Sequence, residues 1–111
     1  MNNPMLIFID AADDAAAYPL SRLLGMTVAA DATILMKFEG SAADTTVEED
    51  NIDLVTITCT SDKELQVMKS ISVAIAGAQA NLGLGYTVIA DDVNSTYVDS
   101  AITGIAITLD T

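Results

Sequence analysis

The chain has 111 residues, with no histidine, no tryptophan and only one cysteine. Without histidine there is no imidazole to serve as a general base, to bind a metal ion or to change charge near neutral pH. The single thiol, Cys59, cannot form a disulfide within the chain, and no basic neighbour in the sequence would activate it as a nucleophile. We therefore expect a protein that is not an enzyme, with no catalytic residue and no cofactor. Cys59 is expected to be a small buried residue.

Basic residues are also scarce: Arg22, Lys37, Lys63 and Lys69 are scattered, whereas sixteen residues are acidic and the net charge is −12. Proteins that bind phosphate groups cluster lysine and arginine, and anionic membranes attract basic segments. We therefore expect neither nucleic acid nor a membrane surface as a partner. No apolar run approaches the ~20 residues that span a bilayer, and Met1–Pro4 lacks the positive charge of a secretory signal.

Apolar residues, in contrast, are abundant. They make up 51% of the chain, and the mean hydropathy is +0.44. A chain of this length forms a single domain, 1–111, close to the lower size limit for a self-sufficient core. An apolar content larger than a small core can bury indicates burial against another chain. We expect a homo-oligomer that its negative charge keeps soluble.

Five segments have the apolar patterns of β-strands: Met5–Asp10, Thr33–Glu39, Ile52–Thr60, Tyr86–Ala90 and Ala101–Leu109. The first is almost wholly apolar, which predicts a strand buried on both faces. The second and third alternate, and their apolar faces consist of Ile34, Met36 and Phe38, and of Val55, Ile57 and Cys59.

The pattern between the first two of these strands is ambiguous. Gly25 either bulges or ends a strand within Leu20–Ala29, and Asp31 predicts a hairpin turn after it. Pro19 favours extended geometry in the residue before it, so a helical turn through Ala15–Ala17 would stop there.

One helix is predicted, over about 62–81. Ser61 and Glu64 fit a capping box, in which the serine side chain accepts from the Glu64 N–H and the glutamate side chain reaches back. Gly83 is suited to end the helix. Apolar side chains recur at three- and four-residue steps and form one stripe: Leu65, Met68, Ile71, Ile75, Ala78 and Leu82.

Together these elements predict an α+β fold of two layers: a mainly antiparallel or mixed sheet of five to six strands, with the helix on one face. Strands flank the helix in the sequence, so a crossover connection can make that pair parallel. The second face of the sheet is expected to be flat and rich in threonine and alanine, and to be available for contact with another copy or a host surface.

Three acidic loops suggest cation binding: Asp10–Asp14, Glu48–Asp53 and Asp91–Asn94. Hard cations take six to eight converging oxygens, and none of these loops has the spacing of an EF-hand. Aspartate and asparagine also occur in turns because their side chains bind nearby backbone groups. We favour the turn interpretation and predict no metal ligand, while the sequence alone leaves cation binding by these loops open.

Three stretches carry a resemblance: LIFIDAADDAAAYPLSRL, VAADATILMKFEG and VIADDVNSTYVDSAITGIAITLD. They resemble small proteins of marine tailed phages that are often regarded as virion components. The resemblance implies a capsid or tail accessory subunit, located in the virion or the host cytoplasm, with other virion proteins as partners. The alternative is an acidic binding module or inhibitor, resembling DNA in its charge, that acts on a basic host protein.

Overall fold

The computed structural model describes residues 4–39, 52–80 and 86–108. Within these ranges lie eight strands, one α-helix and a short 3-10 turn at Leu20–Arg22. The strands are β1 (Met5–Ala11), β2 (Asp14–Pro19), β3 (Leu23–Ala30), β4 (Thr33–Glu39), β5 (Ile52–Cys59), β6 (Tyr86–Asp91), β7 (Thr96–Tyr97) and β8 (Ile102–Thr108), and the helix is α1 (Glu64–Ala80).

The strands form two four-stranded sheets. Sheet A has the order β2-β1-β6-β7, and sheet B has the order β3-β4-β5-β8. The α+β class is confirmed, but the prediction of one sheet with five to six strands is wrong. The crossover through α1 does not pair β5 with β6, because these strands lie in different sheets; β6 pairs in parallel with β1 instead, and the other pairs are antiparallel.

The strand that the sequence pattern missed is β2, which contains the alanine run Ala15–Ala17. Alanine has little preference for strands on its own. Here pairing with β1 decides the conformation, because the small alanines lie beside large β1 side chains: Ile7 pairs with Ala17, and Ile9 pairs with Ala15. A tertiary contact thus determines the structure of a segment whose local sequence is undecided.

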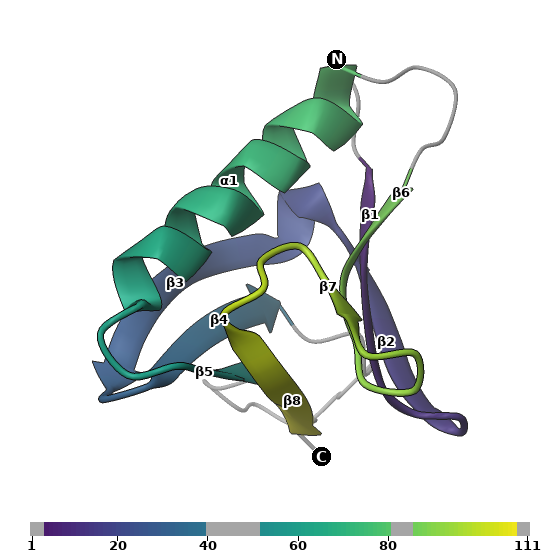
Figure 1. Cartoon of the computed structure of the whole chain (residues 1–111). Helices are drawn as coiled ribbons and strands as arrows, with labels where there is room; N and C mark the ends of the chain where they lie inside the picture. The colour runs from purple at the N-terminus through teal and green to yellow at the C-terminus, as the bar shows by residue number, and fades with distance from the viewer. Residues whose placement is uncertain (1–3, 40–51, 81–85, 109–111) are drawn as a thin grey trace.

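One hydrophobic core is shared by both sheets and the helix. β8 of sheet B contacts β1, β2 and β6 of sheet A, while α1 contacts β4 and β6. Figure 1 shows α1 running diagonally from the side of sheet B toward the top of β1 and β6. The predicted inward faces of β4 and β5 are confirmed: their buried apolar side chains are Ile34, Met36, Phe38, Val55, Ile57 and Cys59.

Three aromatic rings join the two sheets at the centre of this core. Phe8 and Tyr18 come from sheet A, and Phe38 comes from sheet B. The Tyr18 and Phe38 rings stack with centroids 4.3 Å apart, and Phe8 meets Phe38 edge-on at 5.6 Å. Aromatic pairs of this geometry add to the stabilisation from buried area.

A buried hydrogen bond lies beside these rings. The Tyr18 hydroxyl donates to Asp53 Oδ2 over 2.7 Å, and both side chains are buried. Burial, together with the neighbouring Asp53, raises the pKa of Tyr18. Asp53 belongs to both the predicted acidic loop Glu48–Asp53 and the predicted strand Ile52–Thr60. The structure places it on β5 with its side chain buried, and residues 48–51 are outside the described ranges.

The helix begins at Glu64, two residues after its predicted start. Its buried side chains are Val67, Ile71 and Ala78, whereas Leu65 is 63% exposed. Most of the predicted stripe is therefore confirmed, since Met68 and Ile75 are also partly buried against the core. Leu65 lies outside this face, and Val67 is a buried position that the stripe did not include. Leu82 and Gly83 lie outside the described residues. In the described part of the chain no helix is both long and apolar enough to cross a membrane.

We predict that Tyr18→Phe destabilises the protein by about 1–3 kcal/mol, because it removes a donor from a buried carboxylate. Chemical denaturation followed by circular dichroism measures this. Tyr86→Phe is the matched control, since Tyr86 is 46% exposed and an exposed site of this kind changes stability by less than about 0.5 kcal/mol. Equal stability of the two variants would contradict a structural role for the Tyr18–Asp53 hydrogen bond.

Candidate functional site

Two of the three acidic loops come together in the structure. β1 and β6 are parallel neighbours, so their carboxyl ends lie at the same edge of sheet A. Asp10 lies near the end of β1, and Asp92 follows the last residue of β6. The Asp92 N–H donates to the Ile9 carbonyl over 2.8 Å, and this hydrogen bond holds the carboxyl ends of β1 and β6 side by side.

The Asp92 carboxylate is well supplied with donors. The Tyr97 hydroxyl donates to Asp92 Oδ1 over 2.6 Å, and the Ile105 N–H donates to Oδ2 over 3.2 Å. The hydrogen bond to Asp92, followed by burial, raises the pKa of Tyr97 to about 12. Asp92 therefore connects the end of β6 to both β7 and β8.

The position of Asp10 beside Asp92 disfavours the charged form of Asp10. Burial raises the pKa of Asp10, and the hydrogen bond to Asp92 and the charge of Asp14 add to the effect. Two carboxylates in hydrogen-bond contact share a proton more readily than they hold two charges. The convergence of the two loops thus has an energetic cost at neutral pH.

Asp91, next to this pair, forms a turn. Its carboxylate accepts from the backbone N–H groups of Val93 and Asn94 and from the Asn94 side chain, at 2.9–3.1 Å. The hydrogen bond from the Asn94 side chain is the main cause that holds the pKa of Asp91 below its usual range, and the Asn94 N–H adds to it. The turn interpretation of Asp91–Asn94 agrees with these contacts.

A second group of carboxylates joins the β3–β4 turn to the start of α1. The Glu64 carboxylate accepts from the Ala32 N–H over 2.6 Å, and the Ser61 hydroxyl donates to Asp31 over 2.8 Å. Ala32 has a φ of 64°, a left-handed conformation that costs a non-glycine residue about 1 kcal/mol. Two hydrogen bonds hold Ala32 in this conformation: its N–H donates to the Glu64 carboxylate, and its carbonyl accepts from the Cys59 N–H.

These contacts correct the predicted capping box. Because α1 begins at Glu64, the N-cap position falls on Lys63, and Ser61 lies outside the helix. Both side chains of the predicted box bind the hairpin turn. The hydrogen bond from Ala32 is the main reason that the pKa of Glu64 is lowered.

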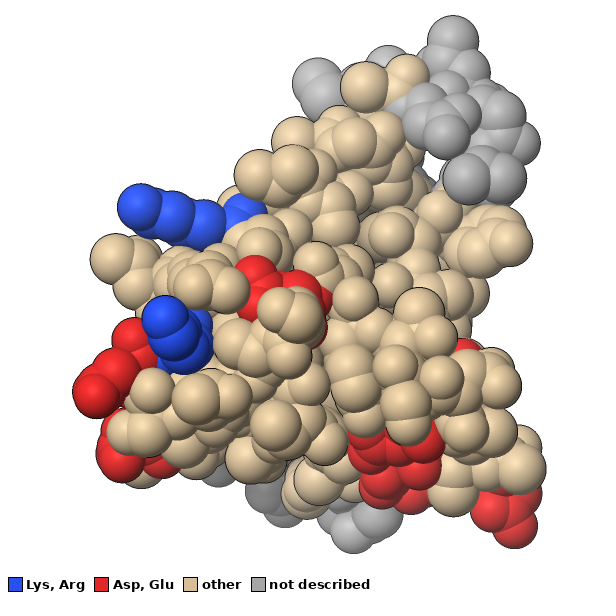
Figure 2. All heavy atoms as spheres, in the orientation of Figure 1, with Lys and Arg blue, Asp and Glu red and all other residues tan. Residues whose placement is uncertain are grey.

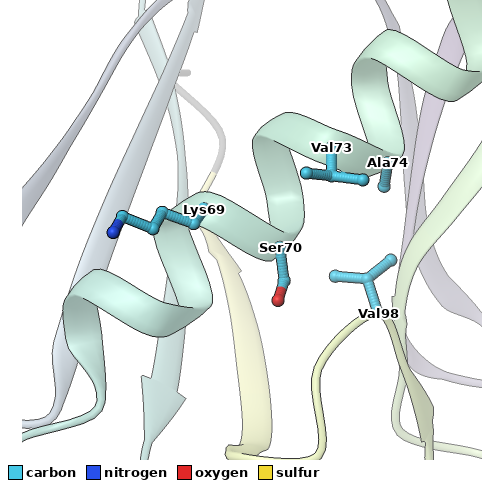
Figure 3. A pocket seen from close by; sticks show the side chains of 5 residues that line it. All are labelled: Lys69, Ser70, Val73, Ala74 and Val98. Atoms are coloured by element: carbon cyan, nitrogen blue, oxygen red, sulfur yellow. The ribbon is translucent and has the colours of Figure 1, made fainter.

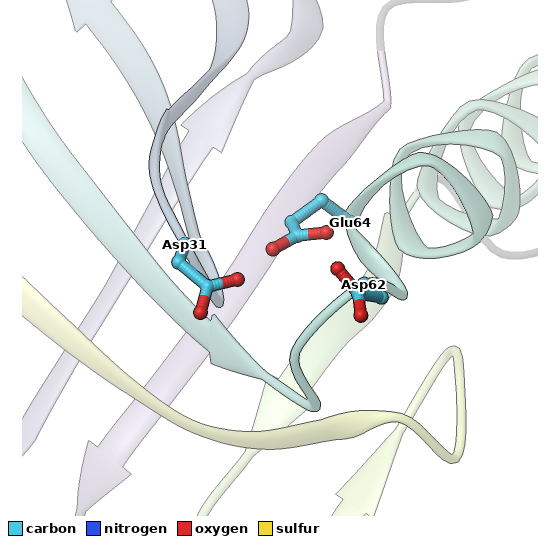
Figure 4. Close-up of side chains that lie close together, drawn as sticks. All are labelled: Asp31, Asp62 and Glu64. Atoms are coloured by element: carbon cyan, nitrogen blue, oxygen red, sulfur yellow. The ribbon is translucent and has the colours of Figure 1, made fainter.

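Asp31, Asp62 and Glu64 are the residues of the described chain whose carboxylate oxygens come close enough to hold a cation. Their ligand oxygens lie within 4.8 Å of one another, and Figure 4 shows the three side chains pointing together. Sequence reasoning missed this group because Asp31 is distant in sequence from the other two. Two of the three carboxylates already accept the hydrogen bonds described above, and three ligands are fewer than calcium takes.

A shallow groove of about 370 Å³ runs along α1, lined by Lys69, Ser70, Val73, Ala74 and Val98. In Figure 3, Val73, Ala74 and Val98 lie around the groove, whereas the Lys69 side chain extends away from it. The groove is mainly apolar, and Val73 is 71% exposed.

The Ser70 hydroxyl beside this groove has a structural partner. It donates to Asp99, which also accepts from Gln66 over 3.0 Å and from the Ala101 N–H over 2.8 Å. The side chain of Asp99 is buried, and these hydrogen bonds lower its pKa, with the largest contribution from Ser70. No histidine exists in the chain to take a proton from Ser70. The contacts attach α1 to the loop before β8.

Cys59 is buried, as the sequence predicted. Burial raises the pKa of its thiol, and the charges of Glu64, Asp31 and Asp99 raise it further. A thiol in this environment stays protonated at neutral pH, which makes it a poor nucleophile.

The outer face of sheet B differs from the rest of the acidic surface. Its side chains form three rows across β3, β4, β5 and β8: Ala30, Thr33, Thr58 and Gly104; Thr27, Leu35, Thr56 and Ala106; and Gly25, Lys37, Leu54 and Thr108. None of these twelve positions is acidic, and Lys37 is the charged one; Glu39, exposed at the end of β4 and paired with Ile52, lies on the same face. The side chains are exposed or half-buried, so the expected threonine- and alanine-rich face is present in the described residues.

The outer face of sheet A is also uncharged at its centre. Met5, Ile7 and Ile9 alternate with the buried Leu6 and Phe8 along β1, and they remain half-buried. The prediction that β1 is buried on both faces is therefore wrong for this side. In the view of Figure 2 acidic side chains gather in separate groups, and uncharged residues cover most of the surface between them.

No protein-family model, no curated protein and no solved structure matches this chain.

We predict that Asp10→Asn raises the melting temperature at pH 7 by roughly 1–4 °C, because the amide donates to Asp92 without carrying a charge. The raised pKa of Asp10 means that the folded state resists its ionisation. This penalty is complete at neutral pH and fades as the pH falls through the folded-state pKa. Below about pH 4, Asp10 is protonated in both the folded and the unfolded state, so we expect the wild-type protein and the Asp10→Asn variant to have the same melting temperature.

Asp13→Asn is the control for the change in net charge, since it removes one charge from an exposed residue of the same turn. Thermal melts from pH 3 to 8 make the comparison. A lower melting temperature for Asp10→Asn at pH 7 would show that the Asp10 charge stabilises the fold, and it would contradict this account.

Proposed function

We propose that this protein is a non-enzymatic structural subunit that assembles with copies of itself. The observation that carries the proposal is the outer face of sheet B, where three rows of side chains across the four strands contain no carboxylate although the chain carries sixteen; Glu39 lies beyond them at the end of β4. A flat surface of threonine, alanine, glycine and leucine loses little hydration free energy when another protein covers it. Copies of a strongly acidic protein repel one another least where they meet on such a face.

The contacts of the carboxylates support the same proposal. Asp53, Asp91 and Asp99 are the buried acids of the described residues, and each accepts hydrogen bonds from its own fold. The groove along α1 is mainly apolar, and its hydroxyl is bound to Asp99. These three carboxylates and the Ser70 hydroxyl thus hold elements of the fold together, and the sheet faces with few charges are left for contact.

The resemblance to small proteins of tailed phages makes the proposal more specific. We propose an accessory subunit of the virion, a decoration of the capsid or tail, present in repeated copies in the particle and in the host cytoplasm before assembly. Symmetric self-association is the usual outcome for a subunit of this kind.

We predict that the wild-type protein sediments as an oligomer at micromolar concentration, and that Thr58→Glu with Ala106→Glu weakens association about tenfold or more. Both side chains are exposed on the outer face of sheet B, and each copy would place new carboxylates in the contact. The control is Ser72→Glu with Ala76→Glu, which adds the same charge on exposed α1 residues. A wild-type mass equal to one chain at all concentrations would contradict self-assembly.

A separate prediction concerns the virion. Mass spectrometry of purified phage particles is expected to detect this chain at a stoichiometry comparable to that of other repeated virion proteins. Recovery from host lysate on a basic protein, in a complex that high salt dissolves, together with absence from particles, would instead favour the acidic binding module.

A further inference from the structure

The turn between β6 and β7, residues 92–95, carries an exposed asparagine, Asn94, followed by the exposed Ser95. In the sequence Asn94 is the one asparagine that precedes a residue as small as serine; the others precede asparagine, proline, isoleucine or leucine. The backbone nitrogen of the next residue can attack an asparagine side chain when a small side chain leaves room for the approach. The two groups belong to one chain, so the reaction is intramolecular and needs no enzyme.

The attacking group in such a reaction is the Ser95 nitrogen. Its N–H donates to no group in the described part of the chain. The Asn94 carbonyl belongs to the same peptide group, and it accepts from the Thr96 hydroxyl over 3.2 Å. When the Ser95 nitrogen loses its proton, the negative charge spreads onto this carbonyl oxygen through the peptide resonance. A donor at the oxygen stabilises that charge, so the Thr96 hydroxyl makes the nitrogen easier to deprotonate.

The leaving group is the Asn94 side-chain nitrogen, Nδ2. It donates to Asp91 Oδ2 over 2.9 Å, and the Asn94 N–H donates to Oδ1 of the same carboxylate over 3.1 Å. The hydrogen bond from the Asn94 side chain is the main reason that the pKa of Asp91 is lowered, so this carboxylate is charged at neutral pH. Nδ2 becomes positive as it gains a proton in order to leave, and the neighbouring carboxylate stabilises the positive charge.

We propose that Asn94 is a site of spontaneous deamidation, with water as the co-reactant. The Ser95 nitrogen gives its proton to solvent and bonds to Cγ of Asn94; the Cγ–Nδ2 bond breaks, and ammonia leaves with a proton from solvent. The product is a succinimide ring, which water opens. Cleavage of the new Cγ–N bond gives aspartate, whereas cleavage between the Ser95 nitrogen and the main-chain carbonyl carbon of residue 94 gives isoaspartate. The inference does not depend on the proposed assembly.

Deamidation weakens the turn in which it occurs. A carboxylate at position 94 meets the Asp91 carboxylate where an amide donor now lies, and two such groups repel each other. β7 has two residues, and it pairs with β6 through Ala90–Tyr97 and Asp91–Thr96. Isoaspartate also adds a methylene group to the backbone of the turn. Conversion therefore loosens β7 from the end of sheet A.

The test follows residue 94 in the full-length protein during days of incubation in mildly alkaline buffer made with heavy-oxygen water. Chymotrypsin cleavage after Tyr86 and Tyr97 releases a peptide in which Asn94 is the only asparagine, and mass spectrometry measures its heavy oxygen. We expect position 94 to convert about tenfold faster than Asn81, because the bulkier Leu82 follows Asn81 and hinders the attack. Equal or slower conversion at position 94 would overturn the inference.

Two variants of Thr96 test the assistance by its hydroxyl. Thr96→Val keeps the shape of the side chain but removes the donor, and we expect conversion at position 94 to slow about three- to tenfold. Thr96→Ser keeps the donor, and we expect nearly the wild-type rate. In denaturant the contact is lost, and all three proteins should convert at the same rate. Equal rates for Thr96→Val and Thr96→Ser in the folded protein would show that the hydroxyl has no part in the reaction.

The consequence for the turn is tested with Asn94→Asp, which carries the aspartate product from the start. We expect its melting temperature at pH 7 to fall by about 2–5 °C, because it loses a hydrogen bond and places like charges together. Faster hydrogen exchange of the 96–97 amides should accompany this fall. Ser95→Asp is the control, since it adds the same charge to the exposed neighbouring residue. If Asn94→Asp melts no lower than Ser95→Asp, the loosening of β7 is overturned, while the modification itself is decided by the heavy-oxygen measurement.

Discussion

Repulsion among sixteen carboxylates in a chain of 111 residues is the constraint on which this structure depends. A small domain with this net charge folds only if its carboxylates are dispersed or given donors. The described acids are placed mainly at the ends of strands and at the start of α1, where backbone N–H groups are available. Asp91, Asp99 and Glu64 each accept a backbone N–H, and the pKa of each is lowered.

The same placement leaves the middle of the outer face of sheet B without negative charge. The central strands of sheet B bury mainly apolar side chains on one face and present mainly threonine and leucine on the other. Charge at the ends of the elements favours solubility, and the strand faces with few charges provide the surface for the proposed contact. Stability, solubility and the proposed assembly therefore follow from one distribution of carboxylates.

Regular alternation made β4 and β5 predictable, because side chains two apart in a strand must share a face. The helix and most of its apolar face were also predictable, with Ile71 and Ala78 buried, although Val67 is buried and Leu65 is exposed. The alanine run of β2 has no local pattern and becomes a strand by pairing with β1. These features depend on contacts between segments far apart in the sequence.

The same limit applies to the carboxylate groups. Asp53 belongs to a predicted acidic loop and a predicted strand, and its hydrogen bond from the Tyr18 hydroxyl joins it to the other sheet. Asp10 and Asp92 meet only because β1 and β6 are parallel, and Asp31 meets Glu64 only because the hairpin turn lies against α1. Acidic loops can be found in one sequence, but their meeting points follow from strand order, which one sequence does not reveal.

The parallel pairing of β1 with β6 also bears on how the chain acquires its structure. During synthesis β1 leaves the ribosome first, whereas its parallel neighbour emerges only after α1 is complete. The hairpins β1–β2 and β3–β4 join neighbouring segments and can close early, but sheet A gains its central hydrogen bonds late. During synthesis there is therefore an interval in which one side of β1 has no neighbouring strand. Repulsion between acidic nascent chains reduces the risk that two copies associate wrongly in this interval.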